Sequence, residues 1–302
     1  MTGWARVAAA ACALLLLSLP ACRSGPDAAT PPVAAPPPAY EAIAEVYNAR
    51  AARLERMWSR AVVQLRYLDE DGRRRSVQGE GHLQVIQPNR LALSAGKLGE
   101  TLFWLGGDSE RFWAFELGDA SRASVGRHEN VGRPCARSLA APVHPLEALD
   151  LLGITALPAS PAPVAWSEDG QALVIEFPGR FGPQRVFVDP VDYLPTRIEL
   201  LDPRDGAAAI VATLEQHERV SLAGSPGYNP RVATRIVIEH PGSESEVRLT
   251  LSDMTDGSGR GRLAEAVFAF ESLLRAFRPD EIVVLDEACD RPAYAAAPGA
   301  TR

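Results

Sequence analysis

The 302-residue sequence has few of the residues that most often form metal or redox sites. It contains four cysteines and five histidines. No CxxC pair is present, which argues against a thioredoxin-like redox site or a zinc knuckle, and no HExxH motif marks a zinc protease. The histidines are dispersed along the chain, so we expect surface or satisfied core side chains rather than a metal cluster. They are His82, His128, His144, His217 and His240.

Catalytic and nucleotide-binding motifs are also absent. No serine lies in a GxSxG motif, and Gly96–Lys97 lacks the upstream glycine of a phosphate-binding loop. Asp69, Glu70 and Asp71 fall where we expect a hairpin tip, so a solvated turn is favoured over acid–base catalysis. The net charge of −7, with scattered arginines, argues against nucleic-acid binding. We therefore expect no enzymatic activity, no metal, no cofactor and no nucleic-acid partner.

Only the N-terminus carries a hydrophobic run, over residues 7–17. This run is shorter than the roughly 20 apolar residues that a transmembrane helix needs. Arg6 is the only charge in the first 21 residues, and small residues follow the run. A short basic start, an apolar centre and small residues before a cleavage point are typical of a secretory signal. We predict a signal peptide over residues 1–21.

The end of this segment resembles the bacterial lipobox. Leu19 stands at −3, Ala21 at −1 and Cys22 at +1 of the expected cleavage point, although Pro20 is less usual at −2. The resemblance implies that Cys22 is diacylated and becomes the acylated N-terminus, which would anchor the protein firmly in a membrane. Arg23 follows instead of Asp, which by the same resemblance implies the periplasmic face of the outer membrane. The alternative is an ordinary signal cleavage that leaves Cys22 free.

Residues 22–39 are predicted to be a tether between the membrane and a folded domain. Six of the thirteen residues from Pro26 to Pro38 are proline, and proline-rich spacers are extended and semi-rigid. We expect the folded domain over residues 40–290 and a disordered Ala/Pro-rich tail over 291–302.

Two cysteines remain once Cys12 leaves with the signal and Cys22 carries lipid. Cys135 and Cys289 form an even pair in an oxidising compartment, which makes them a candidate disulfide. Two separate thiols are the alternative, because the sequence does not measure their separation.

The hydrophobic pattern changes from a helical period to a strand period early in the domain. Apolar residues at helical spacing predict a helix over residues 40–59, and alternation from residue 61 onward predicts strand after strand with short turns. Residues 144–153 predict a short helix that begins at Pro145 and ends at Gly153, and residues 263–277 predict a late one. Ten or eleven antiparallel strands and three helices indicate an α+β fold with one large curved sheet.

The order of these elements is similar to the LolA/LolB superfamily of periplasmic lipoprotein carriers. The resemblance lies in YNARAARLERMWSRAVVQLRY, the DEDG hairpin, GEGHLQVIQPNRLALSAGKLGETLFWLGGDSERFWAFEL, the DLLG helix and LPTRIELLDPRDG. It implies an incomplete, half-closed β-barrel whose open side is covered by helices. It also implies binding of acyl chains, lipid or a lipidated protein partner, in lipid or lipoprotein trafficking or envelope maintenance.

The strands over 101–105 and 111–117 carry large apolar groups on both faces, whereas a half-wet antiparallel sheet should alternate. Both faces should therefore be covered, and an aromatic excess beside a barrel mouth indicates a cavity. The candidate lipid-facing residues are Val63, Leu65, Leu83, Val85, Leu91, Leu93, Leu102, Phe103, Trp104, Phe112, Trp113 and Phe115. The alternative is a non-enzymatic structural or interaction lipoprotein of the envelope, in which the same residues fill a closed core.

Overall fold

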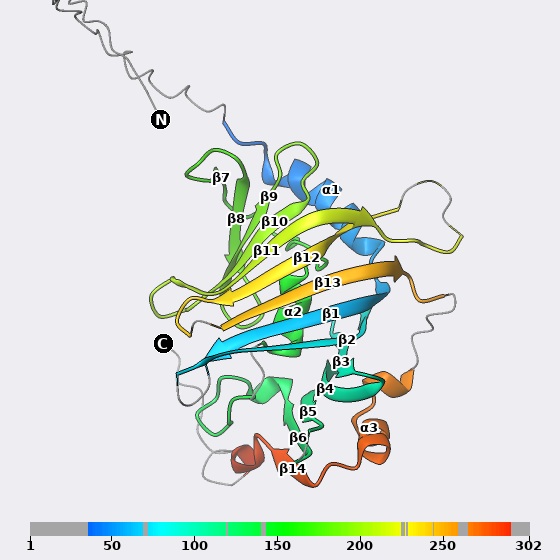
Figure 1. Cartoon of the computed structure of the whole chain (residues 1–302). Coiled ribbons are helices and arrows are strands. Elements are labelled where there is room, and N and C mark those ends of the chain that lie inside the picture. The colour runs from blue at the N-terminus through cyan, green and yellow to red at the C-terminus, as the bar shows by residue number, and fades with distance from the viewer. Residues whose placement is uncertain are drawn as a thin grey trace, which may run out of the picture. The chain divides into compact units, whose positions relative to one another are not determined.

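The computed structural model describes residues 36–68, 72–118, 120–139, 143–224, 227, 229–243, 245–258 and 265–290 (Figure 1). At residue 68 it describes the backbone but not the side chain. The strands within these residues are β1 (Arg56–Leu68), β2 (Arg74–Ile86), β3 (Arg90–Lys97), β4 (Glu100–Gly107), β5 (Arg111–Glu116), β6 (Arg122–Arg127), β7 (Val164–Trp166), β8 (Leu173–Pro178), β9 (Pro183–Val188), β10 (Pro195–Leu201), β11 (Ala208–Arg219), β12 (Arg231–His240), β13 (Ser245–Thr255) and β14 (Glu281–Val284). The helices are α1 (Tyr40–Ala52), α2 (Pro145–Leu151) and α3 (Phe270–Phe277), with short 3₁₀ turns at His128–Asn130, Glu265–Phe268 and Glu287–Asp290.

All the strands of the described chain belong to one sheet, in the order β14-β6-β5-β4-β3-β2-β1-β13-β12-β11-β10-β9-β8-β7. Two meanders, β1–β6 and β7–β13, join through the pairing of β1 with β13. Every pair is antiparallel except β14 with β6. The sheet ends at β7 and β14 and does not close, so the prediction of a large, open antiparallel sheet is confirmed.

One face of the sheet, here called the inner face, packs against α1 and α2. Ile43 of α1 and Leu149 of α2 are fully buried in the same apolar cluster as Leu83 of β2 and Ile175 of β8. Leu83 and Ile175 come from different meanders, so a single core holds the two halves of the sheet together. No helix within the described ranges is long and apolar enough to span a membrane.

The opposite, outer face is covered by α3 at the β4–β6 end. Trp113 and Phe115 of β5 are fully buried there against Phe270 and Leu273 of α3. Phe112, one residue along the strand, points to the inner face and packs edge-on against His144, with ring centroids 4.4 Å apart. This end of the sheet therefore buries apolar side chains on both faces, which explains why its sequence does not alternate.

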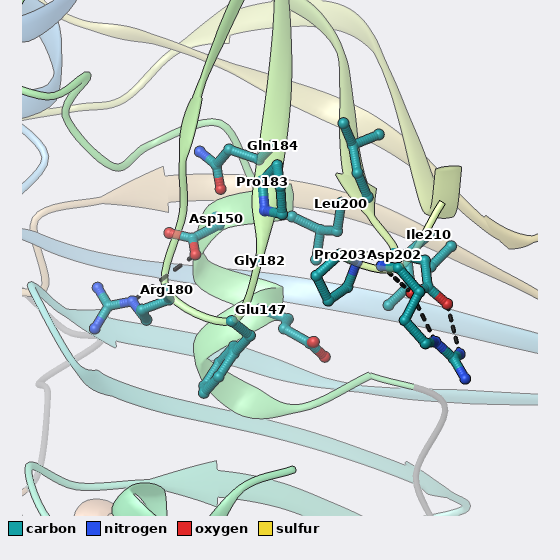
Figure 2. A pocket seen from close by; sticks show the side chains of 14 residues that line it. Glu147, Asp150, Arg180, Gly182, Pro183, Gln184, Leu200, Asp202, Pro203 and Ile210 are labelled. Carbon is teal, nitrogen blue, oxygen red and sulfur yellow. Dashed lines mark hydrogen bonds and ion pairs between the residues drawn. The ribbon is translucent and has the colours of Figure 1, made fainter. Parts of the chain in front are cut away.

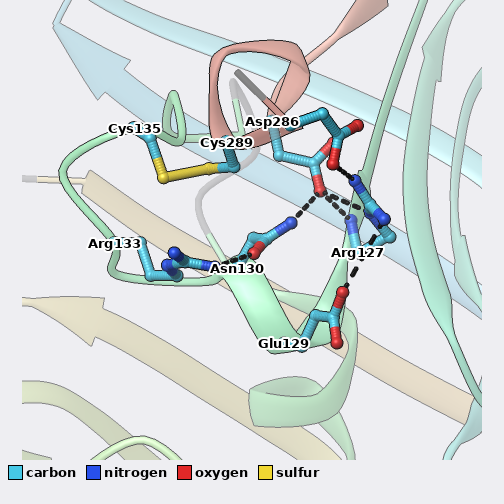
Figure 3. The surroundings of a disulfide bond; sticks show 8 residues. Arg127, Glu129, Asn130, Arg133, Cys135, Asp286 and Cys289 are labelled. Carbon is cyan, nitrogen blue, oxygen red and sulfur yellow. Dashed lines mark hydrogen bonds and ion pairs between the residues drawn. A yellow bond between two sulfur atoms is a disulfide. The ribbon is translucent and has the colours of Figure 1, made fainter. Parts of the chain in front are cut away.

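The C-terminal segment is fixed to the rest of the domain by a disulfide and a polar network (Figure 3). Cys135 and Cys289, 154 residues apart, are joined by a bond of 2.13 Å between their sulfurs. Beside it, the Asp286 carboxylate accepts hydrogen bonds from the backbone N–H of Arg127 at 3.0 Å and from Nδ2 of Asn130 at 2.6 Å. These contacts hold β14 beside β6.

Three predicted elements differ from the structure. The helix predicted over 40–59 ends at Ala52, and β1 begins at Arg56 because pairing with β2 and β13 places Met57 and alternate residues on the inner face. The late helix begins only at Phe270, after a 3₁₀ turn that starts at Glu265. The number of strands is fourteen in the described residues rather than ten or eleven, and the short strands β6 and β14, whose patterns are weak, are among those that the prediction misses.

Candidate functional site

The strand registers align apolar side chains in a row across most of the inner face. Each member stands opposite the next on the neighbouring strand, and the row crosses from β7 through β13 to β1 and β2. We call it the inner row. Its members are Val164, Ile175, Val186, Ile198, Ala212, Ile238, Val247, Leu65 and Val77.

Exposure of the inner row rises toward β1 and β2. Ile175 and Ala212 are completely buried, Val247 is 9% exposed, Leu65 is half-buried and Val77 is 50% exposed. In the described part of the sheet, the pairing of β3 with β2 stops at Glu80, so the strand that carries Val77 extends beyond its neighbour. The row is thus buried from Ile175 to Val247 and becomes partly open to solvent at Leu65 and Val77.

A glycine keeps the sheet tight where this surface begins. A Cβ on Gly81 would lie only 2.1 Å from the carbonyl oxygen of Ser94 on β3. Only glycine therefore permits the close approach of β2 and β3 here.

The twelve predicted lipid-facing residues divide between the two faces, because successive side chains of a strand point to opposite sides. The registers place eight on the inner face: Val63, Leu65, Leu83, Val85, Leu91, Leu93, Phe103 and Phe112. The other four lie on the outer face: Leu102, Trp104, Trp113 and Phe115. Trp113 and Phe115 are covered by α3, and Trp104 packs against that same cluster. The twelve therefore do not line a single surface.

A pocket of about 340 Å³ opens on the inner side, between α2, the β8–β9 connection and the β10–β11 turn (Figure 2). Leu200 and Ile210, which stand opposite each other, contribute to its wall together with Phe181. These two strand residues lie two positions from Ile198 and Ala212 of the inner row, on the same face. The pocket therefore adjoins the inner row.

The polar wall of the pocket comes from α2 and from two ion pairs. Burial raises the pKa of Asp150 to about 6, although the guanidinium of Arg180, 3.8 Å away, opposes that rise. At the other side, a side-chain hydrogen bond from Arg204, with the ion pair at 2.6 Å, lowers the pKa of Asp202 to about 2. Each guanidinium therefore has its own carboxylate.

Glu147 is the third carboxylate of the pocket. The backbone N–H of His144 donates to its Oε2 at 3.0 Å, which forms a capping box at the start of α2. Burial raises the pKa of Glu147, and the neighbouring Asp150 raises it further. Among the ion pairs of the described residues, Glu147 has none. Its carboxylate points into the pocket in Figure 2.

The far end of α2 is held by α1. Arg50 is 3% exposed and donates from Nη2 to the carbonyl oxygen of Gly153 at 2.6 Å, and its guanidinium stacks over the ring of Tyr47 at 4.6 Å. Nη1 of Arg50 donates to the carbonyl oxygen of Arg231 on β12 at 3.2 Å. The helix that carries Glu147 and Asp150 is thus fixed to α1 and, through Arg50, to the sheet.

Two histidines, His128 and His144, pack against each other next to the pocket. Burial lowers the pKa of His144 to about 3 and also lowers the pKa of His128, so both rings are neutral at neutral pH. Their centroids lie 5.4 Å apart. Nowhere in the described ranges do three or more His, Cys, Asp or Glu residues gather as metal ligands.

Sequence reasoning missed the pocket residues Glu147, Asp150 and Arg180. A signal was present, since two carboxylates three residues apart in the otherwise apolar HPLEALDLLG share one helix face. The sequence holds no such signal for Arg180, because only the folded structure brings this residue close to α2. The predicted lipidation site Cys22, the signal peptide and most of the tether lie outside the described residues.

No protein-family model and no curated protein matches the sequence. Solved structures match in fold. A DUF1329 family protein from Desulfovibrio piger has a TM-score of 0.52 and 13% identity, over 78% of this chain and 98% of its own. A putative outer membrane lipoprotein-sorting protein domain from Vibrio parahaemolyticus has a TM-score of 0.51 and 16% identity, over 78% and 99%. A LolA superfamily protein from Nitrosomonas europaea has a TM-score of 0.49 and 14% identity, over 78% and 99%.

The first two likenesses extend over nearly the whole of the matched proteins and most of this chain. They concern the open antiparallel sheet that the order of elements in the sequence predicts. The resemblance to lipoprotein-sorting proteins of the LolA/LolB type is therefore confirmed at the level of the fold.

Proposed function

We propose that this protein is a membrane-anchored lipoprotein that binds a hydrophobic ligand on the inner face of its half-barrel. The ligand is an acyl chain, a lipid or a lipidated protein, and the role is lipid or lipoprotein trafficking or envelope maintenance. The inner row carries the proposal, because it continues from the buried core to the half-exposed Val77 without a polar side chain.

An open apolar surface of this kind is unfavourable in a protein with no ligand for it. Burial of apolar area lowers the free energy by about 25 cal/mol per Å², so the exposed part of the row is stabilised only when a ligand covers it. Contiguous apolar surface bordered by polar residues is typical of a binding site. In this proposal α1 and α2 cover the β7–β13 part of the inner face, and the ligand covers the part at β1 and β2.

The position of the protein in the cell is part of the same proposal. Acylated Cys22 would hold it at the periplasmic face of the outer membrane, with the proline-rich tether as spacer. A putative outer membrane lipoprotein-sorting domain among the structural neighbours supports this setting. We propose a binding protein rather than an enzyme, since the pocket carboxylates are committed to ion pairs and a helix cap.

Binding of a neutral fluorescent probe such as Nile red tests the proposal. Val77→Asp places a charge at the open end of the inner row and should weaken probe binding severalfold. Gln78→Asp makes a similar change at an exposed neighbour on the outer face and should leave binding unchanged. Equal binding by both variants, or no binding by the unmodified protein, would contradict the proposal.

A structural lipoprotein with a filled core is the second candidate. It is favoured by the complete burial of Ile175, Ala212 and Leu149, which shows that the core beneath the helices is closed by side chains. Such a protein would bind no hydrophobic probe and would instead be recovered with an envelope protein after crosslinking. The probe measurement therefore separates the two.

A further inference from the structure

We propose that the hydrophobic ligand carries a zwitterionic head group, a phosphate followed by an ammonium group, and that Arg122 binds this head group together with the glutamates on the two neighbouring strands. This inference rests on the proposed function, and it specifies the chemical class of the ligand. It starts from a guanidinium group that has no partner within the described residues.

A row of charged side chains crosses the last strands of the inner face. Phe103 of β4 stands opposite Glu116 of β5. Glu116 stands opposite Arg122 of β6, and Arg122 stands opposite Glu281 of β14 at the edge of the sheet (Figure 1). The row lies on the inner face, because Phe115, next to Glu116 in sequence, points to the outer face. A negative, a positive and a negative charge therefore follow the apolar Phe103.

The guanidinium group of Arg122 is half-buried and lacks an acceptor. Its Nε is buried without a hydrogen-bond partner. Among the described residues its side chain forms no ion pair, and the side chains of Glu116 and Glu281 are exposed to solvent. A buried N–H donor without an acceptor destabilises the folded protein, and a bound group that supplies the acceptor removes that cost. Arg122 is therefore suited to bind an anionic group.

An acyl chain can approach this row along a partly exposed strip of the inner face. The strip crosses from β1 to β4, which are three strand spacings apart. At about 4.8 Å each these spacings span about 14 Å, on the order of the length of a short acyl chain. Its members are neighbours in the strand registers, and each is partly exposed, unlike the buried part of the inner row: Leu65, Val63, Gly79, Gly81, Leu93 and Phe103.

The order of the charges favours a zwitterion over a simple anion. A phosphate at Arg122 would accept hydrogen bonds from the guanidinium group, including the one from Nε. Neighbouring strands are about 4.8 Å apart, so an ammonium group attached to that phosphate would reach the carboxylate of Glu116 or Glu281. An anionic head group without the ammonium would be attracted by Arg122 and repelled by both glutamates.

Three lipids with the same acyl chain test the inference: lauroyl lysophosphatidylethanolamine, which is zwitterionic, lauroyl lysophosphatidylglycerol, which is anionic, and monolaurin, which is neutral. Each is titrated calorimetrically below its micellar concentration at pH 7.5. The protein is the chain from residue 22 onward with Cys22→Ser, so that it carries no lipid of its own. We expect the zwitterion to bind about tenfold more tightly than monolaurin, as for charge-assisted hydrogen bonds, and the anion to bind no more tightly than monolaurin.

Two variants assign the head-group contacts. Arg122→Gln should bring the zwitterion and monolaurin to nearly equal affinity. Changing Glu116 and Glu281 together to glutamine should let the anion bind at least as tightly as the zwitterion. Arg235→Gln and Glu80→Gln, at exposed positions of the outer face on β12 and β2, are the matched controls and should preserve the wild-type preferences.

Urea unfolding separates a binding role of Arg122 from a structural one. Since its side chain makes no hydrogen bond or ion pair within the described ranges, Arg122→Gln should unfold at the wild-type urea midpoint or above it. A clearly lower midpoint would show that the guanidinium group holds the fold, which would overturn its assignment to a ligand.

The binding results distinguish the head-group inference from the proposed function. If the anion binds wild type as tightly as the zwitterion, or if Arg122→Gln keeps the preference for the zwitterion, the head-group inference is wrong while the proposed function stands. If none of the three lipids binds, the apolar surface is not a binding site and the proposed function fails with it.

Discussion

Asp150 offers a quantitative test of the pocket's electrostatics. Its side chain lies among the titratable and charged groups Glu147, Arg180 and Tyr47, and it is 8% exposed. Replacing it with asparagine keeps the shape and removes the charge. The structure predicts how the difference in unfolding free energy between the variant and wild type depends on pH.

The sign follows from the pKa of Asp150 in the two states. Burial raises it from 3.8 to about 6, so between these values the folded protein binds more protons than the unfolded chain. This group therefore contributes less stability as the pH rises from about 4 through about 6. A tenfold change in proton affinity is worth about 1.4 kcal/mol, so this pKa shift changes the contribution of Asp150 to the unfolding free energy by about 3 kcal/mol in total.

His144 has the opposite effect. Burial lowers its pKa to about 3, so the folded state loses stability as the pH falls below the ordinary histidine value. Since both proteins contain His144, its contribution cancels in the difference between them. Urea unfolding of wild type and Asp150→Asn at pH 4.5, 5.5, 6.5 and 7.5 gives this difference directly.

We expect Asp150→Asn to gain up to about 3 kcal/mol relative to wild type between pH 4 and pH 7, with most of the change complete by pH 7. Glu147→Gln is the matched comparison on the same helix, and the direction of its pKa shift predicts a change of the same sign. A difference between Asp150→Asn and wild type that is independent of pH, or that falls as pH rises, would refute this account of the buried carboxylate.

Three further predictions concern other parts of the chain. Serine at both Cys135 and Cys289 should lower the unfolding free energy by about 2–5 kcal/mol, measured by urea unfolding. An unchanged urea midpoint would show that the polar network around Asp286 holds the C-terminal segment without the disulfide. Phe270→Ala should cost about 3–5 kcal/mol and shift the fluorescence of Trp113, whose ring centroid is 5.6 Å from that of Phe270; an unshifted spectrum would argue against α3 as the cover of the outer face. Cys22→Ser should abolish labelling by a palmitate analogue in bacterial cells, and equal labelling of variant and wild type would remove the lipid anchor.

Local patterns in the sequence predict much of the fold. The segment HPLEALDLLG predicts α2 with Pro145 at its start, and Gly153 follows its end with a φ of 65°, where glycine is favoured. Alternation predicts the long strands of both meanders, because each buries one face. The end of α1 was predicted too late, since residues at helical spacing continue into β1 while pairing with β2 and β13 decides the conformation.

The remaining features depend on contacts between distant residues. β14 pairs in parallel with β6, joining Glu281 to Arg122, and no local period reports such a pairing. The apolar groups on both faces of β5 correctly indicate that both faces of the sheet are covered there, but the sequence does not show that α3 covers the outer face. The pocket combines α2 with turns 30 to 60 residues away, so its charge balance becomes visible only in three dimensions.

Mass spectrometry of an organic extract tests the central claim most directly. The chain from residue 22 onward with Cys22→Ser would be purified from bacterial periplasm beside its Val77→Asp and Gln78→Asp variants. The account predicts that lipid or acyl chains co-purify with the Cys22→Ser protein and with Gln78→Asp, and are depleted severalfold in Val77→Asp. The absence of bound lipid from all three proteins would contradict the claim that the inner face is a hydrophobic binding site.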